Sequence, residues 1–370
     1  MAGNNFDFSP NSYLEKLYQN NQPEFKFVAE TKAEWKFWRE KLKLKIAELI
    51  GGLPGKNAVS SNTGQGVGNL SVETGAVEIL AEKSFKDYKR LRIAYQVKDY
   101  LKIPAYLLIP ASKQKKTQKK FPAVIIAHGH GNGSRETVGL NGAGENLDSP
   151  SCHNNLALDF VRKGYLVIIP ELLGFGDRRL KEDYQKDPNL KANPTANSCY
   201  RISSQLLLSG ESILKYRLWD LISAVELLEK RKDIFNRQIS VVGFSGGAPV
   251  AFLAALFENK IKAAAISGYT SYYKESILVQ RHCLDNYLPG ILNYAELPTM
   301  ISAIAPKPLL IQTAEKDSLF PLQSAQKAYQ EIKKVYRFLN LEEQLKMNIL
   351  EKAEHSVSAA PIIDFFRSLN

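Results

Sequence analysis

The fold is decided by the stretch Gln238-Ile-Ser-Val-Val-Gly-Phe-Ser-Gly-Gly247, whose β-branched run leads directly into a Gly/Ser turn and then into a helix-like segment, residues 248–256. A serine flanked by glycines at a strand-to-helix turn is the nucleophile-elbow pattern. The turn strains the backbone of the serine, and glycines two positions before and after it let neighbouring chain pass without a Cβ clash. An ordinary Gly/Ser turn is the alternative, but the flanking strand and helix favour Ser245 as a nucleophile whose Oγ stands clear of the sheet.

Two backbone N–H groups are expected to bind an oxyanion beside this serine. The first belongs to Gly246, which falls at the helix N-terminus, where an unpaired donor and the helix dipole favour negative charge. The second is expected from the loop His128-Gly-His-Gly-Asn-Gly133, which follows the strand-like run 121–127. Within this loop the backbone N–H of His130 is the favoured donor, and His128 is a candidate for the substrate pocket.

A nucleophile of this kind needs a histidine base and an acid later in the chain, each in a loop after a sheet strand. Of the five histidines, only His282 and His355 follow Ser245, and His355 comes after a strand-like run, the expected position of the base. The acid should lie one strand earlier, in a loop that holds two carboxylates. Asp317 is favoured there, Glu315 competes for the role, and a helix-capping carboxylate is the structural alternative for Asp317.

The roles of the three side chains follow from the protons that must move. Ser245 is expected to attack a carbonyl carbon while His355 takes its proton and later returns one to the leaving group. Asp317 is expected to fix the imidazole tautomer and to stabilise the imidazolium.

A zinc site built from His128 and His130 is the alternative use of the Gly-rich loop, and His153 could join it from the next segment. No carboxylate or cysteine lies near His128 and His130 at ligand spacing, which disfavours a metal. We therefore expect neither a metal nor an organic cofactor.

These residues together resemble the α/β-hydrolase superfamily, over most of residues 70–370. The flanking segments narrow the resemblance to the branch of acetyl xylan esterase-like and dienelactone hydrolase-like enzymes. These segments are 170–178, 219–220, 287–294, 304–310 and 315–321. Dienelactone hydrolases use cysteine as the nucleophile, so the serine of this chain indicates the esterase side of the branch.

The resemblance implies an α/β-hydrolase fold, with a mostly parallel central sheet, antiparallel opening strands and helices on both faces. It also implies a serine carboxylic ester hydrolase that forms an acyl-enzyme on short-chain, acetyl-type esters, with carbohydrate esters as one option. A peptidase or amidase on the same fold is one alternative. A binding protein that has lost catalysis is the other, because a fold alone does not fix a function.

The order of apolar patterns along the chain supports this architecture. Residues 1–65 are expected to form an N-terminal helical extension, in which the capping box Thr31-Lys-Ala-Glu34 opens a helix with a tryptophan stripe that packs on the main domain. Residues 66–370 are expected to form the hydrolase domain. It opens with antiparallel β-type runs at 72–80, 88–97 and 100–109, and from residue 121 onward strands alternate with helices, which is typical of a parallel sheet.

Two insertions are expected to cover the substrate pocket. The polar insertion 178–208 contains two prolines, and the insertion 269–298 is rich in tyrosine. Tyr269 and Tyr287 are pocket candidates because aromatic faces suit sugar rings, although they could equally be core residues. His282 lies in the second insertion and is expected to be structural.

The amino-acid composition narrows the cellular location and the binding partners expected for the protein. The formal charge is +11, but the lysines are scattered and no basic surface interleaved with aromatic residues appears, which argues against nucleic acid. No apolar run is long enough to span a membrane, and residues 1–8 lack the pattern of a signal peptide. Three cysteines are too few for a disulfide framework, which predicts reduced thiols in the cytoplasm. The expected partner is a small-molecule or carbohydrate ester, and a homo-oligomer is left open.

Overall fold

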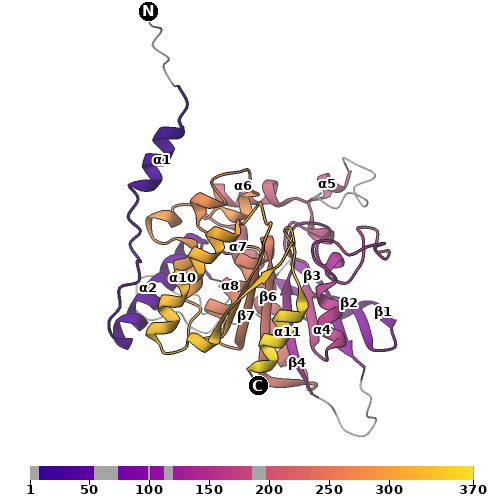
Figure 1. Cartoon of the computed structure of the whole chain (residues 1–370). Helices are drawn as coiled ribbons and strands as arrows, with labels where there is room; N and C mark the ends of the chain where they lie inside the picture. Colours follow the sequence, from indigo (N-terminus) through magenta and orange to yellow (C-terminus); the bar gives the residue numbers. More distant parts are fainter. Residues whose placement is uncertain (1–7, 54–73, 99–100, 112–119, 186–196, 370) are drawn as a thin grey trace, which may run out of the picture.

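The computed structural model describes residues 8–53, 74–98, 101–111, 120–185 and 197–369. Its centre is a nine-stranded sheet in the order β1-β2-β3-β5-β4-β6-β7-β8-β9 (Figure 1). The strands are β1 (Val77–Ser84), β2 (Tyr88–Lys98), β3 (Leu101–Pro110), β4 (Phe121–Ala127), β5 (Leu166–Pro170), β6 (Ile234–Phe244), β7 (Ile261–Ser267), β8 (Leu309–Ala314) and β9 (Leu345–Leu350).

The sheet is mixed in the way the sequence predicts. Strands β1, β2, β3 and β5 pair antiparallel, and from β5 to β9 every neighbouring pair is parallel. The predicted first run, 72–80, is shifted in the structure, where β1 is Val77–Ser84. Every residue of this edge strand is exposed, so no alternation of apolar and polar residues marks its ends.

Helices cover both faces of the sheet, as predicted, because the central strands are apolar on both sides. In β4, Ala123 and Ile125 join one core cluster, while Val124 and Ile126 join the other. The first cluster is closed by helices α2 (Lys32–Leu49), α7 (Ile213–Glu229), α8 (Ala248–Phe257), α9 (Leu297–Ser302) and α10 (Leu322–Phe338). The second is closed by α4 (Leu156–Arg162) and α11 (Ala359–Ser368).

The N-terminal segment reaches the main core through α2. Its capping box is present, with Thr31 and Glu34 each accepting from the backbone of the other. The tryptophan stripe is buried in the same cluster as the central strands, and the indole of Trp38 donates to the carbonyl of Phe25 at 3.1 Å. By contrast, α1 (Asn11–Gln19) buries no residue and projects from the molecule (Figure 1), with Tyr18 donating to Glu296 and Glu15 pairing with Lys274. The boundary expected at residue 65 lies outside the described residues.

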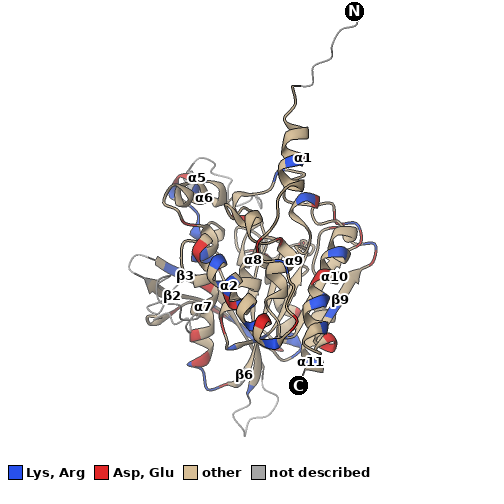
Figure 2. Cartoon of the chain, turned by 90° about the vertical axis from the view of Figure 1, so that its left-hand side faces the viewer, with Lys and Arg blue, Asp and Glu red and all other residues tan. Residues whose placement is uncertain are grey.

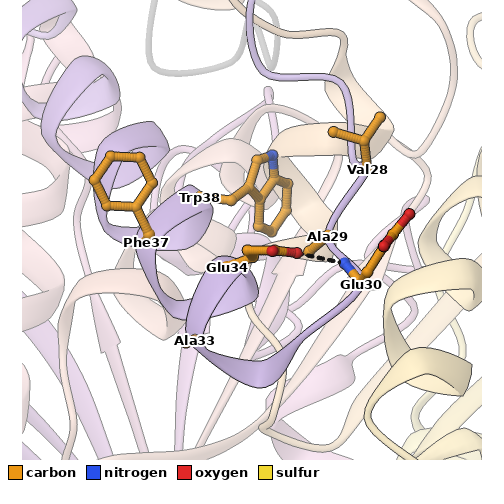
Figure 3. A pocket seen from close by; sticks show the side chains of 7 residues that line it. All are labelled: Val28, Ala29, Glu30, Ala33, Glu34, Phe37 and Trp38. Atoms are coloured by element: carbon orange, nitrogen blue, oxygen red, sulfur yellow. Dashed lines mark hydrogen bonds between the residues drawn. The ribbon is translucent and has the colours of Figure 1, made fainter.

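The surface around α2 carries mixed charge and one apolar groove. Acidic residues are interspersed among the basic ones along α2, whereas α10 is mostly basic, with Glu331 as its acid (Figure 2). The groove lies between the start of α2 and the preceding segment (Figure 3), on elements that hold none of the predicted site residues. It is lined by Val28, Ala29, Glu30, Ala33, Glu34, Phe37 and Trp38. In the part of the chain that the structure describes, no helix combines the length and the apolar character needed to cross a bilayer.

Candidate active site

The elbow after β6 has the backbone that its sequence requires. Ser245 has φ of 51°, a left-handed conformation that costs a serine energy. A Cβ on Gly243 would lie 2.5 Å from the Cβ of Ala251, and one on Gly247 would lie 2.1 Å from the carbonyl oxygen of Ala127. The two glycines are therefore needed for close approach of helix α8 and strand β4 to the turn.

Ser245, His355 and Asp317 meet at the carboxyl ends of the parallel strands. The Nε2 of His355 lies 2.8 Å from the Oγ of Ser245, and its Nδ1 lies 2.7 Å from Oδ2 of Asp317. The other carboxylate oxygen of Asp317 accepts from the backbone N–H groups of Leu319 and Phe320 at 2.9 and 3.0 Å. Asp317 is buried, so its carboxylate is fixed in one orientation by three contacts.

Glu315, the competing acid, does not contact His355 in this way. It is exposed, and its Oε2 accepts from the backbone N–H of Lys352 at 2.6 Å. Lys352 has φ of 56° in the turn just before His355. Glu315 thus holds a strained turn that presents the histidine, and Asp317 faces the imidazole.

The loop predicted to supply the second oxyanion donor packs against the elbow. A Cβ on Gly129 would lie 3.0 Å from the Cβ of Ser245, and one on Gly246 would lie 2.5 Å from the Nδ1 of His130. The ring of His130 is therefore in contact with Gly246. His153, which the sequence offered only as a metal ligand, lies behind the loop, and its Nε2 accepts from the backbone N–H of Gly129 at 3.1 Å.

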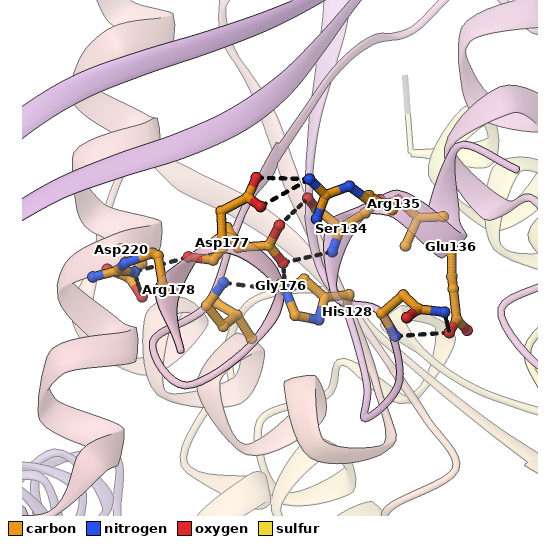
Figure 4. Close-up of polar contacts among 12 residues, drawn as sticks. His128, Ser134, Arg135, Glu136, Gly176, Asp177, Arg178 and Asp220 are labelled. Carbon is orange, nitrogen blue, oxygen red and sulfur yellow. Dashed lines mark hydrogen bonds and ion pairs between the residues drawn. The ribbon is translucent and has the colours of Figure 1, made fainter. Parts of the chain in front are cut away.

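A buried polar network supports this loop from the segment after β5 (Figure 4). Glu171 is fully buried and accepts from both the backbone N–H and the Oγ of Ser134 at 2.8 Å. Burial opposes its charge, but the contacts with His128, Arg92 and the Ser134 amide lower the pKa of Glu171 to about 2. Nearby, Asp177 pairs with Arg135 at 2.8 Å across the same two segments.

Two of the pocket candidates belong to the interior instead. His128 is fully buried, with Nδ1 2.9 Å from the carbonyl oxygen of Gly129 and Nε2 3.1 Å from the amide of Leu172, so it supports the loop rather than lining a pocket. Tyr269 is 2% exposed and is a core residue. Tyr287 is half-buried, and its hydroxyl donates to the carbonyl of Ile277 at 3.1 Å.

Two groups of side chains in the described part of the chain bring metal-binding atoms close together. One contains Glu136, Cys152 and His153, and the carboxylate of Glu136 is already occupied by the His153 ring at 2.9 Å. The other contains His130, Cys199, Cys283 and Asp285, which come from distant parts of the sequence. The sequence reasoning missed this second group, because no spacing along the chain signals it.

Comparisons of the sequence and of the structure with known proteins support this fold. The curated protein YtaP of Bacillus subtilis (strain 168), which is named as a hydrolase, is 26% identical over 307 residues, 80% of this chain and 88% of its own. A Bacteroides fragilis NCTC 9343 structure named as an acetyl xylan esterase superposes with a TM-score of 0.73 at 15% identity, covering 99% of this chain and 96% of its own. A glucuronoyl esterase from Solibacter usitatus gives a TM-score of 0.58 at 13% identity, covering 92% and 93%.

The sequence profile of the dienelactone hydrolase family matches residues 103–357, a span that includes the elbow, the Gly-rich loop and the three facing side chains. That span is well over half of the chain. The chain is accordingly a hydrolase with the α/β-hydrolase fold, and it belongs to the dienelactone hydrolase family.

Proposed function

We propose that this hydrolase cleaves carboxylic esters with Ser245 as its nucleophile and that its substrates are short-chain, acetyl-type esters, including esters of carbohydrates. The observation that carries the proposal is the unbroken line of contacts from Oδ2 of Asp317 through the His355 ring to the Oγ of Ser245, at 2.7 and 2.8 Å. Because the nucleophile at the elbow is a serine rather than a cysteine, the acyl-enzyme would be an oxygen ester and not a thioester.

The acylation step uses each of these groups once. The Oγ of Ser245 bonds to the ester carbonyl carbon as His355 takes its proton at Nε2, and Asp317 stabilises the imidazolium. The backbone N–H groups of Gly246 and His130 donate hydrogen bonds to the carbonyl oxygen, on which negative charge develops. The imidazolium then gives its proton to the leaving alcohol as the ester C–O bond breaks, which leaves an acyl-serine.

Water completes the reaction by the same route. His355 takes a proton from water as the water oxygen attacks the acyl carbon, and the proton returns to Ser245 when the acid departs. The acetyl and carbohydrate preference draws on what the structural relatives are named for. The segments 178–208, of which residues 186–196 lie outside the described residues, and 269–298 are proposed to cover the substrate.

The test compares initial rates on p-nitrophenyl acetate, butyrate and octanoate for the wild type and Ser245→Ala. We expect turnover to fall by roughly three orders of magnitude or more in the variant, with an unchanged circular dichroism spectrum. Treatment with an organophosphonate should add one adduct, located on Ser245 by mass spectrometry. Turnover that survives in pure Ser245→Ala protein would refute the mechanism, and faster cleavage of acetyl p-nitroanilide than of the acetate ester would favour an amidase.

A further inference from the structure

Four side chains with metal-binding atoms converge behind the Gly-rich loop. His130 comes from that loop, Cys199 begins helix α6 (Cys199–Leu208), and Cys283 and Asp285 lie at the short helix η4 (Leu284–Asn286). One ligand atom from each lies within 4.8 Å of every other. Cys199 and Asp285 are buried, and the other two are half-buried. Three segments that are distant in sequence thus supply two sulfurs, one imidazole and one carboxylate.

Nε2 of His130 and Oδ2 of Asp285 form a close contact whose hydrogen-bond geometry is poor. The Nε2 of His130 lies 3.2 Å from Oδ2 of Asp285, yet this buried nitrogen has no hydrogen-bond partner within the described residues. Nitrogen and oxygen ligands of a tetrahedral zinc ion, each at about 2.1 Å from the metal, are about 3.4 Å apart. The observed spacing is compatible with two ligands of one zinc ion.

We propose that His130, Cys199, Cys283 and Asp285 bind one Zn²⁺ ion. Two thiolates with one imidazole and one carboxylate form a donor set that suits zinc. Thiolate sulfurs at about 2.3 Å from zinc are about 3.8 Å apart, which fits the observed limit of 4.8 Å. Four protein ligands leave no open position, so the site is structural. Binding forms two Zn–S bonds and releases the two thiol protons to solvent.

Arg217 supplies the charge balance that such a buried site needs. Its guanidinium donates to Oδ2 of Asp285 at 2.6 Å and to the Sγ of Cys199 at 2.8 Å, and its side chain is fully buried. Two thiolates and one carboxylate carry three negative charges, which Zn²⁺ and the arginine together cancel. Arg217 therefore acts as the outer partner that orients two ligands, a common feature of zinc sites. The ring of Phe175 packs against both Arg217 and His130 and keeps this side of the cluster apolar.

The site would stabilise the proposed oxyanion loop, and this consequence rests on the proposed function. Zinc on Nε2 of His130 leaves the ring proton on Nδ1, the nitrogen that lies against Gly246. The metal would also tie the loop to the two segments proposed to cover the substrate. Metal content, however, can be measured whether or not the protein cleaves esters.

The experiment measures zinc in full-length, untagged protein that has been reduced, incubated with zinc chloride and desalted. We expect about one zinc ion per chain, a thiolate-to-metal charge-transfer band when cobalt replaces zinc, and protection of the half-buried Cys283 from a thiol reagent until a chelator is added. Cys283→Ser and Asp285→Asn should each lower the retained zinc at least about tenfold under the same desalting. Cys152→Ser, a matched change in the exposed cysteine, should retain it.

Several results would overturn the proposal. One is wild-type protein with less than about a tenth of a zinc ion per chain after loading. A second is loss of zinc in Cys152→Ser but not in Cys283→Ser, which would move the metal to the group around His153. A third is the disappearance of two thiols without metal, which would indicate a disulfide between Cys199 and Cys283. Circular dichroism and thermal melting of each variant separate metal loss from unfolding, and Asp285→Asn repeats the test without altering a thiol.

Discussion

Replacing Asp317 with asparagine tests how the proposed base is held. The Oδ1 of Asp317 accepts two backbone N–H groups at 2.9 and 3.0 Å, so an asparagine must keep its carbonyl oxygen there. Its NH₂ group then faces Nδ1 of His355 and requires that nitrogen to be an acceptor. The imidazole proton moves to Nε2, 2.8 Å from Ser245, and the ring can no longer take the serine proton.

The expected cost follows from this change of tautomer. Inverting the histidine proton in a Ser-His-Asp arrangement lowers kcat by about 10⁴-fold, the figure known for a serine protease, which corresponds to about 5 kcal/mol of activation free energy. The assay is kcat on p-nitrophenyl acetate at pH 7, with thermal melting to show that the variant is folded. Glu315→Gln is the matched control, and we expect its kcat to stay within about threefold because a glutamine carbonyl oxygen can still accept from the backbone N–H of Lys352. A loss of less than about tenfold in Asp317→Asn, or a larger loss in Glu315→Gln, would refute the reasoning.

Two further predictions concern stability. Glu136 and Glu171 both have a pKa lowered to about 2, below the usual carboxyl range, so they stabilise the fold above about pH 4.5 and lose this effect as the pH falls toward 2. Urea unfolding of Glu171→Gln between pH 5 and 3 should show a smaller loss of stability than the wild type, and an unchanged slope would contradict this. Gly247→Ala should lower the melting temperature by about 10 °C or prevent folding, because its Cβ would lie 2.1 Å from a backbone oxygen; an unchanged melting temperature would contradict it.

The parts of the site that the sequence predicted are those set by local patterns and chain order. The strand, turn and helix around Ser245 are encoded within a few residues, and the order of serine, acid and histidine follows the order of the strands. The structure accordingly brings His355 and Asp317 to the serine.

The remaining features depend on contacts that no local pattern records. His128 and His130 stand two residues apart in one Gly-rich loop, but burial under the segment after β5 makes one a supporting residue and leaves the other beside Gly246. Tyr269 is in the core because its insertion folds back on the helices, which its composition cannot reveal. The group around Asp285 unites three separate segments, so no spacing along the chain could have indicated it.

The surroundings of His355 constrain how its ring can move during turnover. The ring lies nearly parallel to those of Phe244 and Phe320, with interplanar angles of 29° and 28° and centroid distances of 5.0 and 5.9 Å. A rotation out of this plane would change the contacts of the imidazole with both phenylalanine rings, whereas a small tilt within the plane would largely keep them. The contact of Nδ1 with Asp317 is the natural pivot for that tilt. In the proposed mechanism, such a tilt would carry Nε2 from the serine toward the leaving alcohol without a change of rotamer.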